Sequence, residues 1–407
     1  MSTASASERL FWMAEQVAPG ARSNLAFSAA RIDGPVDVGA LSTAFDAVLG
    51  RHEALRTGYR LTGGTLTRHV DADVPAASLR LLPPGTDPAA ATELLCAEGY
   101  DLAAGQVFRA GVAPTPDGAD LFLAAHHIAI DGMAEELLVA DLAAEYGRVL
   151  DDAPASPGVI PRQPLSDPVG ADQTRRAAYW SEHLAGTPDL PSMGGELPQH
   201  RLYRDTLRER VVHCGPELTA SARRCANEHA VSLFTVLCTA YGQALGALTG
   251  ATDFCVGTSM SLRADAEIGC KVNMLPIRLR DPAAPGAIGR TWDSFTGGFA
   301  HALPFDEIVR ACSPARGRRM PVFQALLTLL GWPRLVTHGG PARFRTVPVS
   351  ARGPLAEIFL EVRDIGDGRL DGVLQAPAHG GWADRLDDLA AAYIATLIEL
   401  CASTPER

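Results

Sequence analysis

Lysine is almost absent from this chain of 407 residues, because the 36 basic residues comprise 35 arginines and a single lysine, Lys271. We interpret the imbalance as the codon bias of a GC-rich gene rather than as chemistry. The 47 acidic residues outnumber the basic ones and leave a net charge of −11. A chain this acidic is not expected to bind nucleic acid or an anionic membrane surface.

Patterns typical of metal sites and disulfide frameworks are also absent. The eight cysteines are scattered and include no Cys-x-x-Cys pair, which predicts a reducing, cytoplasmic location and no metal site. The sequence contains no Gly-x-Ser-x-Gly motif, no P-loop and no Gly-x-Gly-x-x-Gly fingerprint. It therefore gives no sign of a serine hydrolase of that type, a P-loop NTPase or a dinucleotide-binding enzyme.

No hydrophobic run is long enough to predict a membrane span. The most apolar stretch, 232–248, carries two threonines and a glutamine, whereas a span needs about 20 predominantly apolar residues. We predict a buried helix there, with Ser232 as its N-cap. The first twenty residues carry three charged side chains and do not have the pattern of a signal peptide.

Hydrophobic spacing predicts several helices and strands. Helices are expected at 7–16, 37–52, 133–146 and 384–401, and strands at 121–125, 254–259, 272–280 and 357–363. Five prolines between residues 154 and 168 remove backbone donors and predict a linker over 153–168. A chain of this length can form two packed domains, which we place at 1–165 and 166–407.

The most informative segment is a strand-like run that ends in two adjacent histidines, His126 and His127. Asp131 and Gly132 follow, and then the helix-like segment 133–146. Such a junction holds an imidazole at the edge of a sheet, where a carboxylate can lock the loop and a glycine lets the chain turn closely. In isolation, the same pattern also fits two hydrogen-bonded core histidines.

This segment resembles the HHxxxDG motif of nonribosomal-peptide condensation domains and their coenzyme-A-dependent acyltransferase relatives. Six further segments resemble signatures of that family and occur in the family's order. They lie at 7–13, 51–57, 179–186, 256–276, 301–306 and 321–324. The resemblance covers nearly the whole chain.

The resemblance implies an α/β fold of two chloramphenicol-acetyltransferase-like subdomains in a V arrangement, with an active-site tunnel between them. The donor and the acceptor would enter from opposite ends of the tunnel. Each could be attached to the phosphopantetheine arm of an acyl or peptidyl carrier protein. No permanently bound cofactor and no metal is expected, because a carrier-bound thioester is already activated.

The resemblance also assigns roles around the motif. His127 would handle the proton while His126 holds the loop, and the helix after Gly132 could stabilise developing negative charge. Asp131 would pair with Arg263 as a structural clamp. Further support of the site is expected from Arg56, in the second signature.

Four residues are expected to bind substrate, and they are Met133, Lys271, Asn273 and Thr328. Lys271 replaces a position that is usually aromatic in the family, and we expect it either to be exposed or to receive a carboxylate in the tunnel. Strand alternation would place it on one face with Asn273. Thr328 is the one polar candidate in 325–331, where the family usually carries a polar run.

The function we expect is that of a free-standing condensation enzyme in nonribosomal peptide or related natural-product biosynthesis. It would transfer a carrier-bound acyl or aminoacyl group to a small-molecule or carrier-bound amine, which gives an amide. The alternatives are an ester-forming acyltransferase with an alcohol acceptor, and a catalytically silent recruitment or scaffold protein. The intact histidines disfavour the heterocyclising branch of the family, and a missing glutamate in 259–265 disfavours the epimerising branch.

Positive charge is concentrated near the end of the chain. Between Arg310 and Arg352 there are eight arginines and no acidic residue. This window predicts either a docking surface for an acidic carrier protein or its phosphate, or a solvated face together with arginines at the edge of the core.

Overall fold

The computed structural model describes residues 2–70, 79–154, 171–263, 267–313, 319–331, 335–347, 349, 353–364 and 368–402. Chain contacts divide the protein into two compact units. Unit 1 consists of Met1–Ser166, Ser261–Val272 and Arg334–Arg352, and unit 2 of Asp167–Met260, Asn273–Pro333 and Gly353–Arg407. The predicted linker, from residue 155 onward, and the predicted boundary after residue 165 lie outside the described residues. That boundary stays a prediction.

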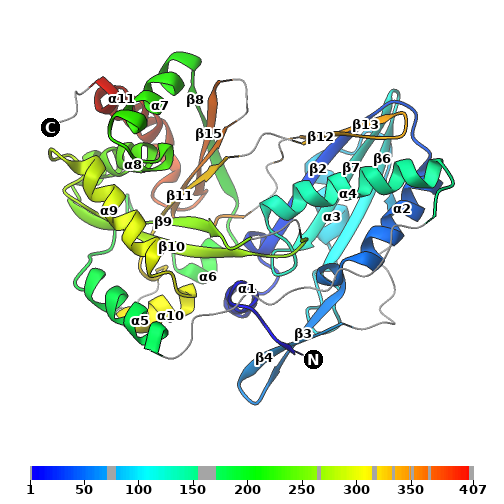
Figure 1. The fold of residues 1–407 in the computed structure, drawn as a ribbon, viewed down its shortest axis with the longest axis horizontal. Coiled ribbons are helices and arrows are strands. Elements are labelled where there is room, and N and C mark those ends of the chain that lie inside the picture. The colour runs from blue at the N-terminus through cyan, green and yellow to red at the C-terminus, as the bar shows by residue number, and fades with distance from the viewer. Residues whose placement is uncertain are drawn as a thin grey trace. The chain divides into compact units, whose positions relative to one another are not determined.

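Unit 1 is a mixed α/β unit (Figure 1). Its elements in chain order are β1 Ser2–Thr3, α1 Ala6–Val17, η1 Arg22–Asn24, β2 Leu25–Asp33, α2 Val38–Arg51, η2 Glu53–Arg56, β3 Thr57–Thr62, β4 Thr65–Val70, β5 Arg80–Leu81, α3 Pro88–Cys96, β6 Phe108–Thr115, β7 Gly118–His126, α4 Gly132–Leu150, β12 Val336–Gly339 and β13 Ala342–Val347. Six strands form one sheet in the order β12-β13-β2-β7-β6-β5, and β1-β4-β3 form a second.

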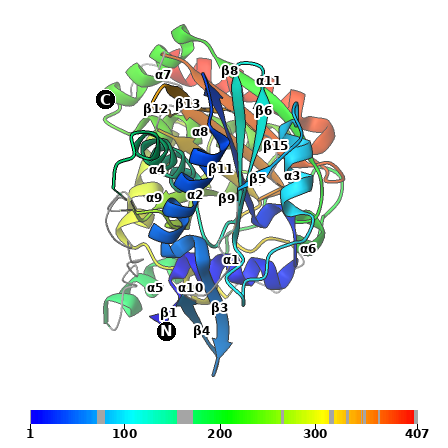
Figure 2. The same ribbon diagram turned by 90° about the vertical axis from the view of Figure 1, so that its right-hand side faces the viewer.

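Strand β7 is apolar on both sides because both faces of its sheet are covered. Leu121, Leu123 and Ala125 pack into the core under α2 and α4, whereas Phe122 and Ala124 pack into a separate core with α3. Figure 2 shows α2 and α4 on one side of β6 and α3 on the other. The uninterrupted apolar run before the histidines is thus the signature of a strand buried on both faces.

Unit 2 holds the second six-stranded sheet, in the order β10-β9-β11-β14-β15-β8. Its elements are α5 Ala171–His183, α6 Gln199–Leu202, β8 Leu207–Cys214, α7 Pro216–Glu228, α8 Leu233–Thr249, β9 Asp253–Ser261, β10 Val272–Arg280, α9 Ala287–Ala300, α10 Phe305–Cys312, β11 Ala325–Leu330, β14 Ile358–Asp364, β15 Leu370–Pro377, η3 Ala383–Arg385 and α11 Leu386–Ala402. Helices α7, α8 and α11 pack on the sheet around one core, as Figure 1 shows.

The predicted α/β class is confirmed, and each helix and strand predicted from hydrophobic spacing is present within a few residues of its expected ends. The predicted buried helix is α8, where Ser232 accepts a hydrogen bond from the backbone N–H of Thr235 and Gly250 ends the helix in the left-handed conformation. Among the described residues, no single helix is long and apolar enough to cross a membrane. Helices α7 and α8 together have the length and apolar composition of a span, but the chain bends by 108° between them.

Candidate active site

The loop after β7 is fixed to the start of β2. In the antiparallel register of these strands, His126 lies opposite Leu25. The backbone N–H of His127 then donates to the carbonyl of Asn24 at 2.7 Å, and Ala129 N–H donates to the carbonyl of His126 at 2.9 Å. The two histidines therefore lie in a short backbone segment that is hydrogen-bonded on both sides.

The His126 ring is used to hold this loop, as predicted. Its Nδ1 accepts a hydrogen bond from the N–H of Ile128 at 3.1 Å, and its Nε2 lies 3.2 Å from the Glu15 carboxylate. A ring nitrogen that accepts carries no proton, so the hydrogen-bond network assigns the neutral Nε2–H tautomer to His126. The side chain is 2% exposed.

The His127 ring is fixed by an aromatic contact rather than by its neighbour in the motif. It stacks on Phe11, with ring centroids 4.2 Å apart and planes within 7°, and the residue is 7% exposed. Phe11 and Glu15 lie four residues apart on α1 and therefore on the same side of that helix. One helix thus supports both histidines.

The sequence did not identify either contact. Helix α1 was predicted from its own spacing, but the pattern of 7–16 contains no information about which strand end it meets. The i, i+4 spacing of an aromatic and a carboxylate was the available signal, and it is common in helices that support no site.

Asp131 forms the predicted ion pair with Arg263. The Nη2 of Arg263 donates to both carboxylate oxygens, at 2.8 and 3.0 Å. The same carboxylate accepts from the N–H of Ala134 at 2.9 Å, as the N-cap of α4, and from the N–H of Lys271 at 2.7 Å. Asp131 therefore joins the start of α4 to the segment 261–272 through hydrogen bonds on both of its carboxylate oxygens.

Lys271 is buried, which contradicts an exposed lysine. Its Nζ lies 2.6 Å from the Glu267 carboxylate, and both side chains are 5% exposed. Desolvated charges need partners, and Glu267, four residues earlier, supplies this one. In the folded protein the Lys271 ammonium is therefore already paired with a carboxylate of its own chain.

Gly132 does not have the conformational role that we predicted. It is the first residue of α4, and a Cβ at this position would meet no heavy atom within 4 Å. There is space for a side chain at this position, so no close approach of neighbouring atoms requires a glycine here. Met133 follows in the same turn and is half-buried.

Two other predicted residues, Arg56 and Asn273, make hydrogen bonds to the backbone. Arg56 donates to the carbonyl of Gly50 at 3.1 Å and so supports the end of α2. In unit 2, the Asn273 amide donates to Leu303 O at 2.7 Å and accepts from Phe305 N–H at 3.1 Å. Its polar atoms thus hold the turn before α10. Their roles at a substrate stay predictions.

Thr328 lies on β11 in unit 2, where its hydroxyl is 3.0 Å from that of Ser259 on β9. The residue is 8% exposed. The structure therefore groups His126, His127, Asp131, Arg263 and Lys271 within unit 1 and places Asn273 and Thr328 in unit 2.

Helix α4 is held by two residues next to the end of α2, Arg51 and His52, which lie in the family signature at 51–57. Arg51 Nη2 donates to Glu145 at 2.6 Å, and His52 Nε2 lies 2.7 Å from Asp141. Burial tends to raise the pKa of Asp141, but the hydrogen bond with His52 and the charge of Arg51 hold that pKa below its ordinary value of 3.8. These contacts join α2 to the helix that Asp131 caps.

We predict that Asp141→Asn lowers the free energy of unfolding by about 1–2 kcal/mol at neutral pH. Because the folded pKa of Asp141 is depressed, its contribution is present above the ordinary carboxyl pKa and is lost as pH falls through the folded value. Urea unfolding at several pH values tests this: the gap between wild type and variant should close below pH about 4. A gap that is constant with pH would contradict the assignment.

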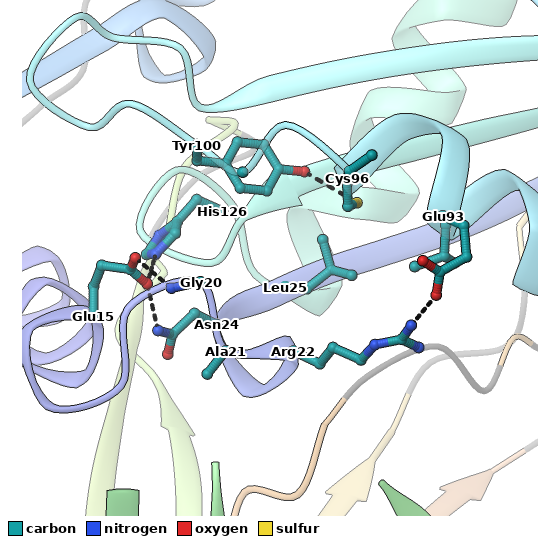
Figure 3. A pocket seen from close by; sticks show the side chains of 13 residues that line it. Glu15, Gly20, Ala21, Arg22, Asn24, Leu25, Glu93, Cys96, Tyr100 and His126 are labelled. Atoms are coloured by element: carbon teal, nitrogen blue, oxygen red, sulfur yellow. Dashed lines mark hydrogen bonds and ion pairs between the residues drawn. The ribbon is translucent and has the colours of Figure 1, made fainter. Parts of the chain in front are cut away.

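A pocket of about 250 Å³ lies behind His126 (Figure 3). Its lining comes from α1, η1, α3 and the end of β7, and it includes Glu15, Arg22, Asn24, Glu93, Cys96, Tyr100 and His126. The Arg22 and Glu93 side chains pair with each other and are at least half exposed. Among the described residues, no group of three or more His, Cys, Asp or Glu side chains could hold a metal ion.

Several arginines of the window 310–352 are paired with acidic side chains, so their positive charges are partly neutralised. Arg319 is paired with Glu357 at 2.7 Å, and their side chains are 8% and 6% exposed. Arg310 pairs with Asp306, and Arg345 with Asp33. Arg316, Arg318, Arg334 and Arg352 lie outside the described residues. Arg319 therefore fits the alternative of an arginine at the edge of the core and not a docking surface, because its charge is neutralised inside unit 2.

Comparison with known proteins identifies the family. Residues 3–332 match the sequence model of the family described as Condensation domain. The chain is 30% identical over 341 residues to the hybrid PKS-NRPS synthetase LUC5 of Fusarium sp, covering 79% of this chain and 8% of that protein. It is 29% identical over 358 residues to the probable non-canonical nonribosomal peptide synthetase CymA of Salinispora arenicola, covering 81% of this chain and 4% of that protein. The chain thus spans less than a tenth of the length of these two relatives.

Solved structures share the fold at low sequence identity. The X-domain from teicoplanin biosynthesis matches with a TM-score of 0.80 at 20% identity, over 100% of this chain and 96% of that one. The first condensation domain of the CDA synthetase gives 0.78 at 20% identity, over 100% and 97%. The SgcC5 protein from Streptomyces globisporus gives 0.76 at 20% identity, over 98% of each chain. With the HHxxxDG loop in place and the family model matched over most of its length, the chain belongs to the condensation-domain family of nonribosomal peptide synthesis, with the two chloramphenicol-acetyltransferase-like lobes of that fold.

Proposed function

We propose that this chain transfers an acyl or aminoacyl group from a carrier-bound thioester to an amine and so forms an amide. The observation that carries the proposal is the division of labour between the histidines. His126 is used for hydrogen bonds that hold the loop, whereas His127 is oriented by stacking on Phe11. Such an arrangement fixes the plane of the His127 imidazole, while the hydrogen bonds of His126 hold the loop that carries it.

The proposed reaction needs one proton to move and no external energy source. The amine nitrogen attacks the thioester carbonyl carbon, the C–S bond breaks, and the phosphopantetheine thiol leaves. The proton that the nitrogen loses ends on the sulfur. An imidazole can accept and return a proton near neutral pH, and we assign this role to His127. Positioning of the two substrates would supply much of the remaining rate enhancement.

The carrier protein and its phosphopantetheine arm are the proposed partner and co-substrate. Curated relatives that are nonribosomal peptide synthetases support this assignment at the level of the family. Action as a free-standing enzyme stays a prediction, as do the V arrangement and the tunnel that the resemblance implies.

The proposal is tested by supplying an acyl-loaded carrier protein with a panel of amines and, in parallel, with the matching alcohols. We expect an amide product by mass spectrometry that depends on both the protein and the amine. Ester formation with the alcohols alone would replace the amide assignment by the ester-forming alternative. An absence of transfer with every acceptor, by protein that still binds the carrier, would favour the scaffold alternative.

Phe11→Ala tests the orientation of His127. Removing the stacked ring lets the imidazole leave its plane, and aromatic contacts of this kind are worth about 0.5–1.5 kcal/mol. We expect turnover to fall by up to about tenfold with little change in KM. Phe299→Ala is the matched control, because Phe299 is 57% exposed and lies on α9. An equal effect of both variants would contradict the orienting role of Phe11.

A further inference from the structure

Glu15, on the last turns of α1, contacts both residues that flank His127 in space. Its Oε2 lies 3.2 Å from His126 Nε2 and accepts from Asn24 Nδ2 at 2.6 Å. Its Oε1 accepts from the N–H of Gly20 at 2.8 Å. Figure 3 shows the carboxylate between the His126 ring, Gly20 and the Asn24 amide.

Resting on the proposed function, we infer that Glu15 is a positioning residue that fixes the tautomer of His126 and thereby the loop that carries His127. The two contacts of the His126 ring demand the same tautomer. Ile128 N–H needs a bare Nδ1, and a carboxylate needs a proton on Nε2. In the opposite tautomer, Nδ1–H would face the N–H of Ile128, and a bare Nε2 would face the carboxylate.

The same carboxylate is also connected to His127 through the hydrogen bonds of Asn24. The Asn24 side chain donates to Glu15, while the Asn24 carbonyl accepts from the backbone N–H of His127 at 2.7 Å. Glu15 therefore restrains the loop from the β7 side through His126 and from the β2 side through Asn24. Both routes lead to the backbone of His127.

Glu15 has the charge that this role needs. Burial tends to raise the pKa of Glu15, but the hydrogen bonds with His126, Gly20 and Asn24 hold that pKa below its ordinary value of 4.5. The carboxylate is thus ionised at neutral pH and accepts on both oxygens.

The other titratable and charged groups near His126 do not compete for its Nε2. Tyr100 meets the ring edge-on at 6.0 Å, and burial raises the pKa of Tyr100 well above 10.0, so the phenol is neutral. Cys96 bonds to that phenol, and Arg109 lies over its ring. Arg22 and Glu93, across the pocket, pair with each other.

The test compares Glu15→Gln with Glu93→Gln. Both replace a carboxylate by an amide in the lining of one pocket, but Glu93 pairs with Arg22 and not with His126. A glutamine offers one acceptor oxygen, so it cannot serve the Gly20 N–H on one side and the His126 and Asn24 donors on the other. We expect Glu15→Gln to lower kcat by about 10–100-fold with KM nearly unchanged, and Glu93→Gln to match wild type.

A second readout does not depend on activity. In protein labelled with ¹⁵N-histidine, the His126 nitrogens, assigned by their loss in His126→Asn, should report one Nε2–H tautomer in wild type and Glu93→Gln. A mixture of tautomers is expected in Glu15→Gln. Glu15→Asp, which keeps the charge and both oxygens, should restore part of both the tautomer and kcat.

The inference is overturned if Glu15→Gln keeps a single His126 tautomer and wild-type kcat, or if Glu93→Gln loses as much activity. Failure of the proposed function looks different: wild type itself would then show no transfer. In that case the nitrogen spectra still decide whether Glu15 sets the tautomer. Thermal unfolding of each variant checks that the fold is retained.

Discussion

His127→Ala should lower amide formation by about 10²–10⁴-fold, the usual contribution of a general acid–base group. The reason is specific to one ring. Both ring nitrogens of His126 are engaged in contacts with Ile128 and Glu15. His126 therefore cannot take over proton transfer from His127 without breaking the contacts that hold the loop. The loss should appear in kcat, because the carrier and the amine are not expected to bind through the imidazole.

The experiment measures initial rates with a loaded carrier, together with the circular dichroism and thermal midpoint of the variant. His213→Ala is the matched control, because His213 is 74% exposed and pairs with Asp371 on the β8–β15 edge of unit 2. It should leave the rate unchanged. A His127→Ala protein that folds normally and turns over at nearly the wild-type rate would remove proton handling by His127 from the account.

Asp131→Ala should destabilise unit 1 by about 3–5 kcal/mol, because it leaves a buried guanidinium without its carboxylate. The Arg263 and Asp131 side chains are 8% and 10% exposed. The variant also removes the acceptors of Ala134 N–H and Lys271 N–H, and loss of an N-cap alone costs about 1 kcal/mol. We expect poor solubility or a strongly lowered unfolding midpoint in urea.

A double-mutant cycle separates the charge from the cap. Arg263→Met combined with Asp131→Ala should destabilise the protein by clearly less than the sum of the single changes, because no unpaired buried charge remains. Asp120→Ala is the control, since its pair with Arg31 leaves both side chains more than a quarter exposed and should contribute under about 1 kcal/mol. A stable Asp131→Ala protein with only a rate defect would mean that Asp131 takes part in the chemistry.

Local patterns in the sequence identified those features that depend on local physics. The strand Val272–Arg280 was predicted with both ends correct, because its apolar alternation is bounded by Lys271 and by Asp281. The histidine motif and the Asp131–Arg263 pair were found because a family signature records a long-range contact that no spacing rule contains.

Contacts that form only in the folded chain account for what the sequence could not reveal. Lys271 looked exposed because a lone lysine usually is, yet Glu267 neutralises it in the interior. The window Arg310–Arg352 did not show that Arg319 is buried, since its partner Glu357 lies 38 residues further on. Phe11 and Glu15 were placed on the right helix, but only the folded chain shows that this helix meets the end of β7.

The most direct test of the account is a time course of the intact mass of an acyl-loaded carrier protein, mixed with this protein and an amine. The account predicts that the carrier loses the acyl mass and returns to its free-thiol form at the rate at which amide appears, one for one, and that this exchange nearly stops in His127→Ala. Release of the acyl group as the free acid, or a carrier mass that stays unchanged over the same period, would contradict it.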